Sequence, residues 1–328
     1  MVNGYLEKVK EQKMKISFVI PCYASAKTLP AVVEEIRDTM HTLPQYTYEI
    51  ILVNDSSPDN TMEIIHELCD RYDNIVGIGL AKNFGQHAAL MAGFHEVTGD
   101  VIVCLDDDGQ TPACEVGKLL EKIENGYDVV YAEYGNKQHS GFRNFGSRVN
   151  KIMTEYLLDK PKNLYISSYF AAKRFIVNNM LEYEHSYPYV IGLVLRATKN
   201  ITNVPVNHRA RIEGTSGYSL KKLLALWFNG FTAFSVKPLR IATCAGVLFA
   251  VGGFVYALYL IIRKLLYPDL VLLGWSSTIS LLMIIGGIIL LVLGIIGEYV
   301  GRIYICINRA PQFVVREKIG RSEDQIEK

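Results

Sequence analysis

Two long apolar runs in the last third of the chain constrain its architecture most. Residues 241–262 and 270–297, runs of 22 and 28 residues, contain no Asp, Glu, Lys or Arg. A helix rises about 1.5 Å per residue, so either run is long enough to cross a hydrocarbon core of about 30 Å. The sequence therefore predicts two transmembrane helices. A pair of very apolar core helices in a soluble protein is the alternative interpretation.

Basic residues beside the two runs predict how they cross the membrane. Lys237 and Arg240 precede the first run, and only Arg263 and Lys264 are basic in the connection between the runs. Six basic residues follow the second run: Arg302, Arg309, Arg316, Lys318, Arg321 and Lys328. Positive charge is enriched on the cytosolic side of membrane proteins. We therefore expect an integral protein of the plasma or bacterial inner membrane, with both termini and the first 240 residues in the cytosol.

The first part of the chain alternates between apolar stretches and helical patterns, which is typical of a parallel sheet covered by helices. We expect strands at residues 16–20, 48–53, 75–80 and 101–105. We expect helices at residues 28–41, from residue 60, and at 85–97. Pro21 is expected to end the first strand. The predicted fold class is therefore α/β, with a mostly parallel central sheet.

An acidic cluster follows the last of these predicted strands. Asp106, Asp107 and Asp108 are consecutive, and Gly109 and Gln110 come next. Three carboxylates at the end of a buried strand repel one another, so a bound cation is a natural compensator. Carboxylate and amide oxygens suit Mg²⁺ or Mn²⁺ rather than zinc. A solvated acidic loop is the alternative, although ligands of open α/β sheets collect at the carboxyl ends of strands.

The polar ends of the predicted strands are expected to line one crevice. They carry Tyr23, Asp55, Lys82 and the acidic cluster. A nucleotide is the usual occupant of such a crevice, although the GxGxxG fingerprint and the GxxxxGK[ST] phosphate loop are both missing. Phosphate charge must then be met by a metal ion and by basic side chains. Residues 207–218, which contain two arginines, are either a loop that closes over an anionic ligand or an ordinary surface loop.

A different pattern precedes the first apolar run. Residues 220–234 place apolar side chains at helical spacing, with lysines between them. This predicts an amphipathic helix at the membrane surface, or else a helix packed on the preceding domain. We therefore divide the chain into an α/β domain (1–218), an amphipathic juxtamembrane region (219–238), a two-helix transmembrane region (239–301) and a basic cytosolic tail (302–328).

Composition excludes several classes of protein. The six cysteines show no CxxC spacing and no paired histidine pattern, which argues against structural zinc and against a disulfide framework. The net charge of +1 is the sum over a near-neutral domain and a basic tail. We expect no nucleic-acid partner. Glycines at 286, 287, 294 and 297 allow close helix approach and are compatible with a homo-oligomer.

Four motifs together resemble a known family. They are FVIPCY at 18–23, NFG at 83–85, LDDDGQ at 105–110 and GEYVGRIY at 297–304. The chain is similar to the polyprenyl-phosphate glycosyltransferases of the bacterial two-span type. These are relatives of dolichol-phosphate mannose synthase within the family 2 glycosyltransferases. The resemblance implies the GT-A fold for the cytosolic domain, which would then be catalytic.

The resemblance also implies roles for residues on the nucleotide side of the site. Asp55 matches the acidic residue that reads the uracil or guanine base, and Asp106 matches the first residue of the DxD motif, near the nucleotide. Asp108 matches the metal ligand on the diphosphate, with Gln110 beside it. The remaining implied nucleotide contacts are Pro21, Tyr23, Lys82, Ser216 and Tyr218. Lys82 stands where the family usually has arginine.

For the reaction, the resemblance implies inverting transfer of one sugar from a nucleotide-diphosphate sugar, with a UDP-sugar favoured. The acceptor is the phosphate of a polyprenol, such as undecaprenyl phosphate, at the cytosolic face of the lipid bilayer. Arg143, Arg148 and Arg211 match positions that contact phosphates. Asp106 or Asp107 acting as a general base is left open. The competing functions are a transferase that elongates a glycolipid or polysaccharide, and a catalytically silent membrane scaffold.

Three positions depart from the family pattern. Gly109 stands after the DxD motif, where it is expected to loosen the turn that follows the metal ligand. Ser168 lies in the segment where relatives carry Gly-Asp-Phe-Arg, and Gly217 replaces the usual lysine before the loop tyrosine. We expect these differences to affect which sugar is transferred more than the type of reaction.

Overall fold

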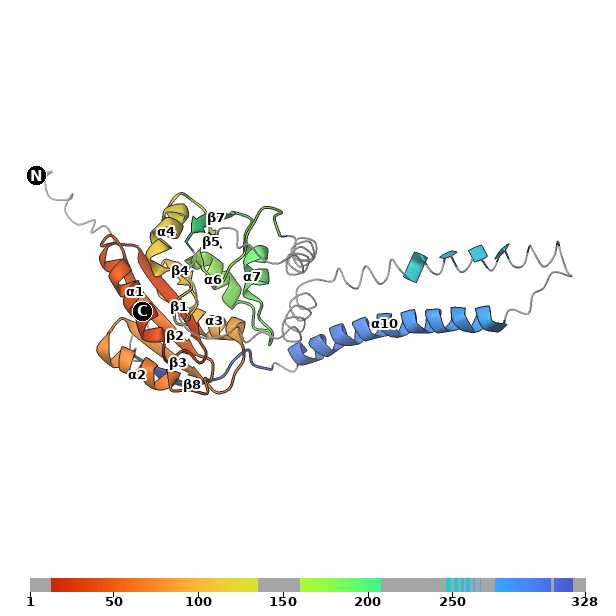
Figure 1. Cartoon of the computed structure of the whole chain (residues 1–328), viewed down its shortest axis with the longest axis horizontal. Helices are drawn as coiled ribbons and strands as arrows, with labels where there is room; N and C mark the ends of the chain where they lie inside the picture. The colour runs from red at the N-terminus through yellow and green to blue at the C-terminus, as the bar shows by residue number, and fades with distance from the viewer. Residues whose placement is uncertain are drawn as a thin grey trace, which may run out of the picture. The chain divides into compact units, whose positions relative to one another are not determined.

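The computed structural model describes residues 13–134, 160–207, 275–307 and 310–320, together with short stretches between 246 and 266 (Figure 1). The predicted amphipathic helix and most of the first apolar run lie outside the described residues. Two compact units make up the chain. The first contains Met1–Ser219 and Ala310–Lys328, and the second contains Leu220–Arg309. The four-part division proposed from the sequence stays a prediction.

An eight-stranded sheet forms the centre of the first unit, in the order β7-β5-β6-β4-β1-β2-β3-β8. The strands are β1 (Lys15–Cys22), β2 (Thr47–Asn54), β3 (Ile75–Leu80), β4 (Val101–Cys104), β5 (Val129–Tyr134), β6 (Phe170–Lys173), β7 (Ile201–Val206) and β8 (Val315–Ile319). Strands β1 to β4 run parallel, as do β5 and β7, whereas β6 and β8 are antiparallel to their neighbours. The predicted mostly parallel sheet is confirmed.

Helices cover both faces of this sheet (Figure 1). They are α1 (Leu29–His41), α2 (Thr61–Arg71), α3 (Gln86–Phe94), the 3-10 helix η1 (Ala113–Glu115), α4 (Val116–Glu124), α6 (Arg174–Leu181) and α7 (Val190–Ala197). The apolar faces of α1, α2 and α4 join one core with alternate residues of β1 and β2. On the opposite face, α3 packs on β1 and β2, and α6 packs on β4 and β6.

Helix α3 lies unusually close to the sheet because it carries Gly93 at the contact. A Cβ atom at that position would lie 2.5 Å from Cγ1 of Val19 and 3.1 Å from Cγ2 of Val53. Real Cβ atoms do not approach other carbons so closely, so any larger residue would push the helix away from the sheet. This close packing holds the C-terminal part of α3 against β1 and β2.

Pro21 does not end the first strand, which corrects the prediction from the sequence. Strand β1 continues to Cys22, and Pro21 pairs with Val53 of β2. The carbonyl of Cys22 accepts a hydrogen bond from Asp55 on the β2 side, whereas that of Val19 accepts one from Leu105 on the β4 side. Alternation along the strand therefore turns the nitrogen of Pro21 toward β4, where the ladder has already ended at Val19. The missing N–H costs no ladder bond.

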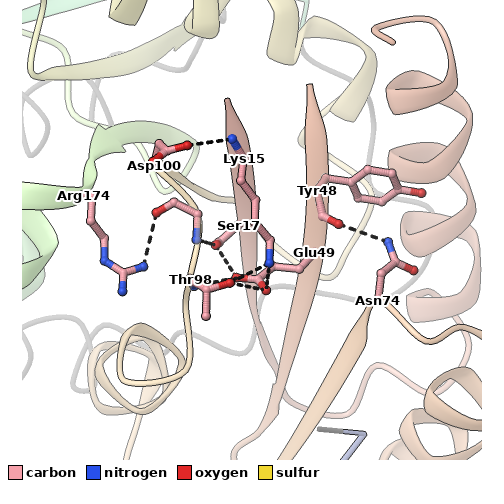
Figure 2. Close-up of polar contacts among 9 residues, drawn as sticks. Lys15, Ser17, Tyr48, Glu49, Asn74, Thr98, Asp100 and Arg174 are labelled. Atoms are coloured by element: carbon pink, nitrogen blue, oxygen red, sulfur yellow. Dashed lines mark hydrogen bonds and ion pairs between the residues drawn. The ribbon is translucent and has the colours of Figure 1, made fainter. Parts of the chain in front are cut away.

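A buried polar network closes the opposite, amino-terminal edge of the sheet (Figure 2). The carboxylate of Glu49 lies 2.8 Å from Nζ of Lys15 and accepts hydrogen bonds from the hydroxyl of Ser17 and from the backbone N–H of Thr98, each at 2.6 Å. Ser17 in turn accepts a bond from the N–H of Gly99 at 2.8 Å. The network ties β1, β2 and the turn before β4 together, far along the strands from their carboxyl ends.

The second unit contains α10 (Trp275–Ile307). Apolar side chains on its described residues are widely exposed, including Leu282 at 65% and Ile307 at 73%. Within the described parts of the chain, we find no helix that is both long and apolar enough to cross a membrane. The two transmembrane helices stay a prediction. After α10 the chain returns to the first unit as β8, a strand that the sequence did not predict.

Candidate active site

The carboxyl ends of β1 to β4 meet at one edge of the sheet, as predicted. Tyr23 follows β1, Asp55 follows β2, Lys82 follows β3, and the acidic cluster follows β4. Two hydrogen bonds join these ends directly. The backbone N–H of Asp55 donates to the carbonyl of Cys22, and the N–H of Tyr23 donates to Oδ2 of Asp107, each at 3.0 Å. Polar groups that are distant in the sequence therefore line one edge.

Asp55 is held by the segment that leads into α3. Its two carboxylate oxygens accept hydrogen bonds from the backbone N–H groups of Phe84 at 2.7 Å and Gly85 at 2.8 Å. Burial raises the pKa of Asp55, and these two bonds oppose the rise. Each carboxylate oxygen retains a further lone pair that can accept from a ligand. Lys82 lies in the same segment, with Nζ 4.9 Å from the ring centre of Phe84.

Both carboxylate oxygens of Asp106 accept hydrogen bonds from other side chains. Oδ1 accepts a hydrogen bond from Nε2 of Gln86 at 3.0 Å, and Oδ2 accepts one from the hydroxyl of Ser168. Burial raises the pKa of Asp106 to about 6, and repulsion from Asp108 and Asp107 adds to the rise, while the hydrogen bonds from Ser168 and Gln86 oppose it. The position and the charge of Asp106 therefore depend on a residue of α3 and on a residue just before β6.

Asp107 and Asp108 have different surroundings. Asp107 accepts the N–H of Tyr23, which fastens the acidic cluster to the end of β1, and burial raises its pKa. Asp108 accepts the backbone N–H of Gln110 at 3.0 Å. This short turn passes through Gly109 at φ +70°, a left-handed conformation that favours glycine. Gly109 therefore shapes a tight turn rather than a loose one, which corrects the expectation from the sequence.

Gln86 and Ser168 are the polar contacts of Asp106 that reasoning from the sequence missed. Ser168 is one of the departures from the family pattern, and Gln86 directly follows the NFG motif. Ser168 is 62 residues away from Asp106 in the chain. The two meet because β6 pairs antiparallel with β4, so that Phe170 lies opposite Cys104. No local pattern predicts that pairing.

Five predicted site residues lie outside the described residues. They are Arg143, Arg148, Arg211, Ser216 and Tyr218. Their implied roles in contacting phosphates and nucleotide stay predictions. The other predicted residues, from Pro21 to Gln110, lie on or directly after the four parallel strands.

The acidic cluster fits a divalent cation in its chemistry. Asp108 and Gln110 offer hard oxygen donors. Burial is the main cause of the raised pKa of Asp106, and repulsion from Asp108 and Asp107 adds to it. Within the described residues, no group of three or more His, Cys, Asp or Glu side chains is placed to hold a metal ion. A site with few protein ligands still suits Mg²⁺, which commonly binds one or two carboxylates together with substrate phosphates and water.

Comparison with known proteins identifies the family. Residues 17–181 match the model of glycosyl transferase family 2, and residues 237–303 match the GtrB C-terminal hairpin. The chain belongs to glycosyl transferase family 2. This glycosyltransferase is 33% identical over 321 residues to the undecaprenyl-phosphate 4-deoxy-4-formamido-L-arabinose transferase of Yersinia enterocolitica, covering 97% of both chains. The protein of that name from Yersinia pestis is 33% identical over 319 residues, again with 97% coverage of both.

These relatives place the glycosyltransferase among the polyprenyl-phosphate glycosyltransferases, as the motifs indicated, and its α/β domain is GT-A-like. Among solved structures, it is similar to the glucosyl-3-phosphoglycerate synthase of M. tuberculosis, with a TM-score of 0.49 and 17% identity over 66% of this chain and 78% of that one. A structure of the Mycobacterium tuberculosis enzyme with Mn²⁺, uridine-diphosphate and phosphoglyceric acid gives a TM-score of 0.48 and 19% identity, over 65% and 75%.

Proposed function

We propose that this glycosyltransferase moves one sugar from a nucleotide-diphosphate sugar, favouring UDP, to undecaprenyl phosphate or a similar polyprenyl phosphate. The product is a lipid-linked sugar that serves as a donor for glycan modification. One observation carries the proposal. Asp55 and the acidic cluster lie at the same edge of the sheet in a family 2 domain. The names of relatives that match 97% of the chain support a polyprenyl-phosphate acceptor.

The proposed chemistry needs alignment more than activation. A polyprenyl phosphate is already anionic near neutral pH, so its oxygen requires little help from a general base. Transfer with inversion requires that this oxygen and the leaving diphosphate be held on opposite sides of the anomeric carbon. Asp55, which the two N–H groups orient, is the proposed reader of the base. Pro21, Tyr23 and Lys82 lie at the same edge of the sheet.

Asp108 and Gln110 are the proposed holders of Mg²⁺ or Mn²⁺. When bound, such a cation would supply positive charge to the leaving diphosphate. The neighbouring residues have distinct tasks. Asp107 anchors the cluster on Tyr23, while Asp106 is held as an acceptor near the nucleotide. The choice between Asp106 and Asp107 as a general base is left open, and burial raises the pKa of both.

Positive charge for the two phosphate groups is proposed to come from Arg143, Arg148 and Arg211. Ser216 and Tyr218 would complete the loop that covers the donor. The need for these groups follows from charge: two anionic reactants must be held together, and the described part of the strand edge is itself acidic.

Attachment to the lipid bilayer is also part of the proposal. The two uncharged runs have the length of transmembrane helices, and the match to the C-terminal hairpin spans residues 237–303. Exposed apolar side chains along the described residues of α10 are of the kind that lipid covers, for example Leu293 at 56% and Val300 at 57% exposure. The basic flanks support a cytosolic active site and cytosolic termini. A homo-oligomer through the glycines of 286–297 remains part of the proposal.

A panel of nucleotide sugars tests the proposed function. The full chain, purified in detergent, is incubated with radiolabelled UDP-sugars or GDP-sugars, undecaprenyl phosphate and Mg²⁺ or Mn²⁺. We expect one donor to give a charged lipid product that carries a single sugar. A product with repeated sugars would favour an elongating transferase. Failure of every donor, together with no metal-dependent binding of UDP or GDP, would contradict the proposal.

Removal of the Ser168 hydroxyl should shift the pH dependence of the reaction. The hydrogen bond from Ser168 opposes the rise in the pKa of Asp106, so Ser168→Ala should move that pKa upward from about 6. If ionised Asp106 is required, activity is lost as pH falls through its pKa, and the acid limb of kcat/KM should move to higher pH by about one unit.

The matched control for this experiment is Ser167→Ala. The Ser167 hydroxyl donates to the backbone carbonyls of Ala132 and Tyr169, each at 2.8 Å, so its removal perturbs the same segment without touching Asp106. We expect its acid limb to stay in place even if the rate falls. An unmoved acid limb in Ser168→Ala would show that Asp106 ionisation does not govern the reaction.

A further inference from the structure

The segment of residues 310–320, here named the C-terminal strap, covers one edge of the sheet and also contacts the chain beyond that edge. It contains β8, which pairs antiparallel with β3 from Gly77 opposite Ile319 to Leu80 opposite Val315. Without β8, the outer edge of β3 would expose unpaired backbone groups, so covering that edge is the simplest role for the strap. A strand that only covered the edge would need no contact beyond Leu80, where β3 ends.

The strap reaches one residue further and fixes Ala81 by both of its backbone groups. The N–H of Ala81 donates to the carbonyl of Val314 at 2.8 Å. The carbonyl of Ala81 accepts a hydrogen bond from Nη2 of Arg316 at 3.0 Å. Ala81 is the first residue of the connection between β3 and α3, so the strap determines where that connection starts.

The same connection holds Asp55. Three and four residues after Ala81, the N–H groups of Phe84 and Gly85 donate to the two carboxylate oxygens of Asp55. A shift at Ala81 therefore moves Lys82 directly and moves both donors that orient Asp55. No residue of the strap needs to touch the nucleotide for its contacts to affect nucleotide binding.

Other contacts of the strap show that it is fastened along its whole length. The hydroxyl of Ser186, before α7, donates to the carbonyl of Ala310 at 2.5 Å, and Nε2 of the buried Gln312 donates to the carbonyl of Tyr183. At the other end, Nζ of Lys318 lies 2.6 Å from the carboxylate of Glu96. Only two residues separate the strap from the end of α10 at Ile307.

We propose that the C-terminal strap positions the nucleotide-binding connection of residues 81–85, with Arg316 as the positioning residue. This inference rests on the proposed function, because it takes Asp55 as a reader of the nucleotide. It adds a role for a segment outside the matched family 2 region, which ends at residue 181. The proposal also means that nucleotide affinity depends on the segment that follows α10 in the chain.

The test compares Arg316→Ala with Lys318→Ala in the full chain in detergent. Both variants remove one positive charge from β8, but of the two residues only Arg316 contacts Ala81. Hydrogen exchange of the peptide covering residues 81–86 is measured without ligand, and UDP affinity and donor kinetics are measured with metal present. A single hydrogen bond of this kind changes an equilibrium by about fivefold.

For Arg316→Ala we expect about fivefold faster exchange at Phe84 and Gly85, and about fivefold weaker binding of UDP, with a higher KM for the donor and kcat within about twofold. Arg316→Lys should recover part of the affinity, since lysine can also donate to a carbonyl. Lys318→Ala should leave all three quantities nearly unchanged.

Each contrary result has a separate meaning. Unchanged exchange at residues 81–86 in Arg316→Ala overturns the positioning role whatever the substrate is. Faster exchange with unchanged UDP affinity, or equal effects of the two alanine variants, overturns it as well. If the unsubstituted chain binds neither UDP nor GDP, the proposed function fails first, and the inference fails with it.

Discussion

Asp108→Asn should reduce turnover by about a thousandfold or more while leaving the fold intact. Asparagine has nearly the shape of aspartate and still presents an oxygen to the N–H of Gln110, so the turn through Gly109 can be kept. What is lost is the negative charge that a divalent cation requires. Loss of charge stabilisation on a leaving group typically costs several powers of ten in rate. We therefore expect the effect in kcat rather than in the thermal stability of the enzyme.

Two measurements separate a metal ligand from a structural aspartate. In the unsubstituted enzyme, binding of UDP should be strengthened by Mn²⁺ or Mg²⁺, and in Asp108→Asn that dependence should disappear. The control is Asp70→Asn on the exposed side of α2, which removes one negative charge near the start of β3 and therefore at the opposite edge of the sheet. Turnover of Asp108→Asn within about tenfold of normal, with metal dependence retained, would remove Asp108 from the proposed metal site.

The sequence predicted the strand edge well because the signals there are local. Each parallel strand is a short apolar run that ends at a polar residue, and parallel topology alone brings those ends together. Asp55 and the acidic cluster were therefore found without any knowledge of contacts. Family resemblance then supplied their roles, which no local pattern distinguishes.

Features that depend on antiparallel or distant pairing could not be predicted in this way. Ser168 meets Asp106 only because β6 inserts between β4 and β5. The sequence of Val315–Ile319 is typical of a charged tail, because three of its five residues are charged. In the structure this segment is an edge strand. Such strands tolerate charge because one side of the ladder faces solvent. The prediction that Pro21 ends the first strand was wrong for a related reason. Whether the missing N–H of a proline removes a hydrogen bond depends on which neighbouring strand is still paired at that residue.

The buried Glu49 network was also missed, although every member is visible in the sequence. Glu49 lies within β2, where a charged residue between apolar ones suggests a solvent-facing position. It is instead 2% exposed, and its partners come from β1 and from the turn before β4 (Figure 2). Such a charge is tolerated only because its lone pairs are filled by close donors. The network therefore predicts a large stability effect at a place remote from catalysis.

Glu49→Gln should lower the free energy of unfolding by about 3 kcal/mol at neutral pH. Burial alone would raise the pKa of Glu49, but the bonds from Lys15, Ser17 and Thr98 outweigh it and lower the pKa from 4.5 to about 2. A difference of this size between unfolded and folded states corresponds to about 3 kcal/mol of stability. Because the folded pKa is the lower one, this contribution is complete above pH 4.5 and disappears as pH falls toward 2.

Thermal unfolding of the full chain in detergent, measured from pH 7 to pH 3, checks this expectation. At pH 7 the unfolding temperature of Glu49→Gln should lie about 8 °C below that of the unsubstituted chain. The gap should narrow below pH 4.5, because there the Glu49 carboxylate of the unfolded chain takes up a proton while that of the folded chain stays ionised. Glu34→Gln is the control, because Glu34 is 45% exposed in its pair with Arg37 and should contribute little. A gap that stays constant with pH would mean that packing, rather than the ionised carboxylate, accounts for the stability.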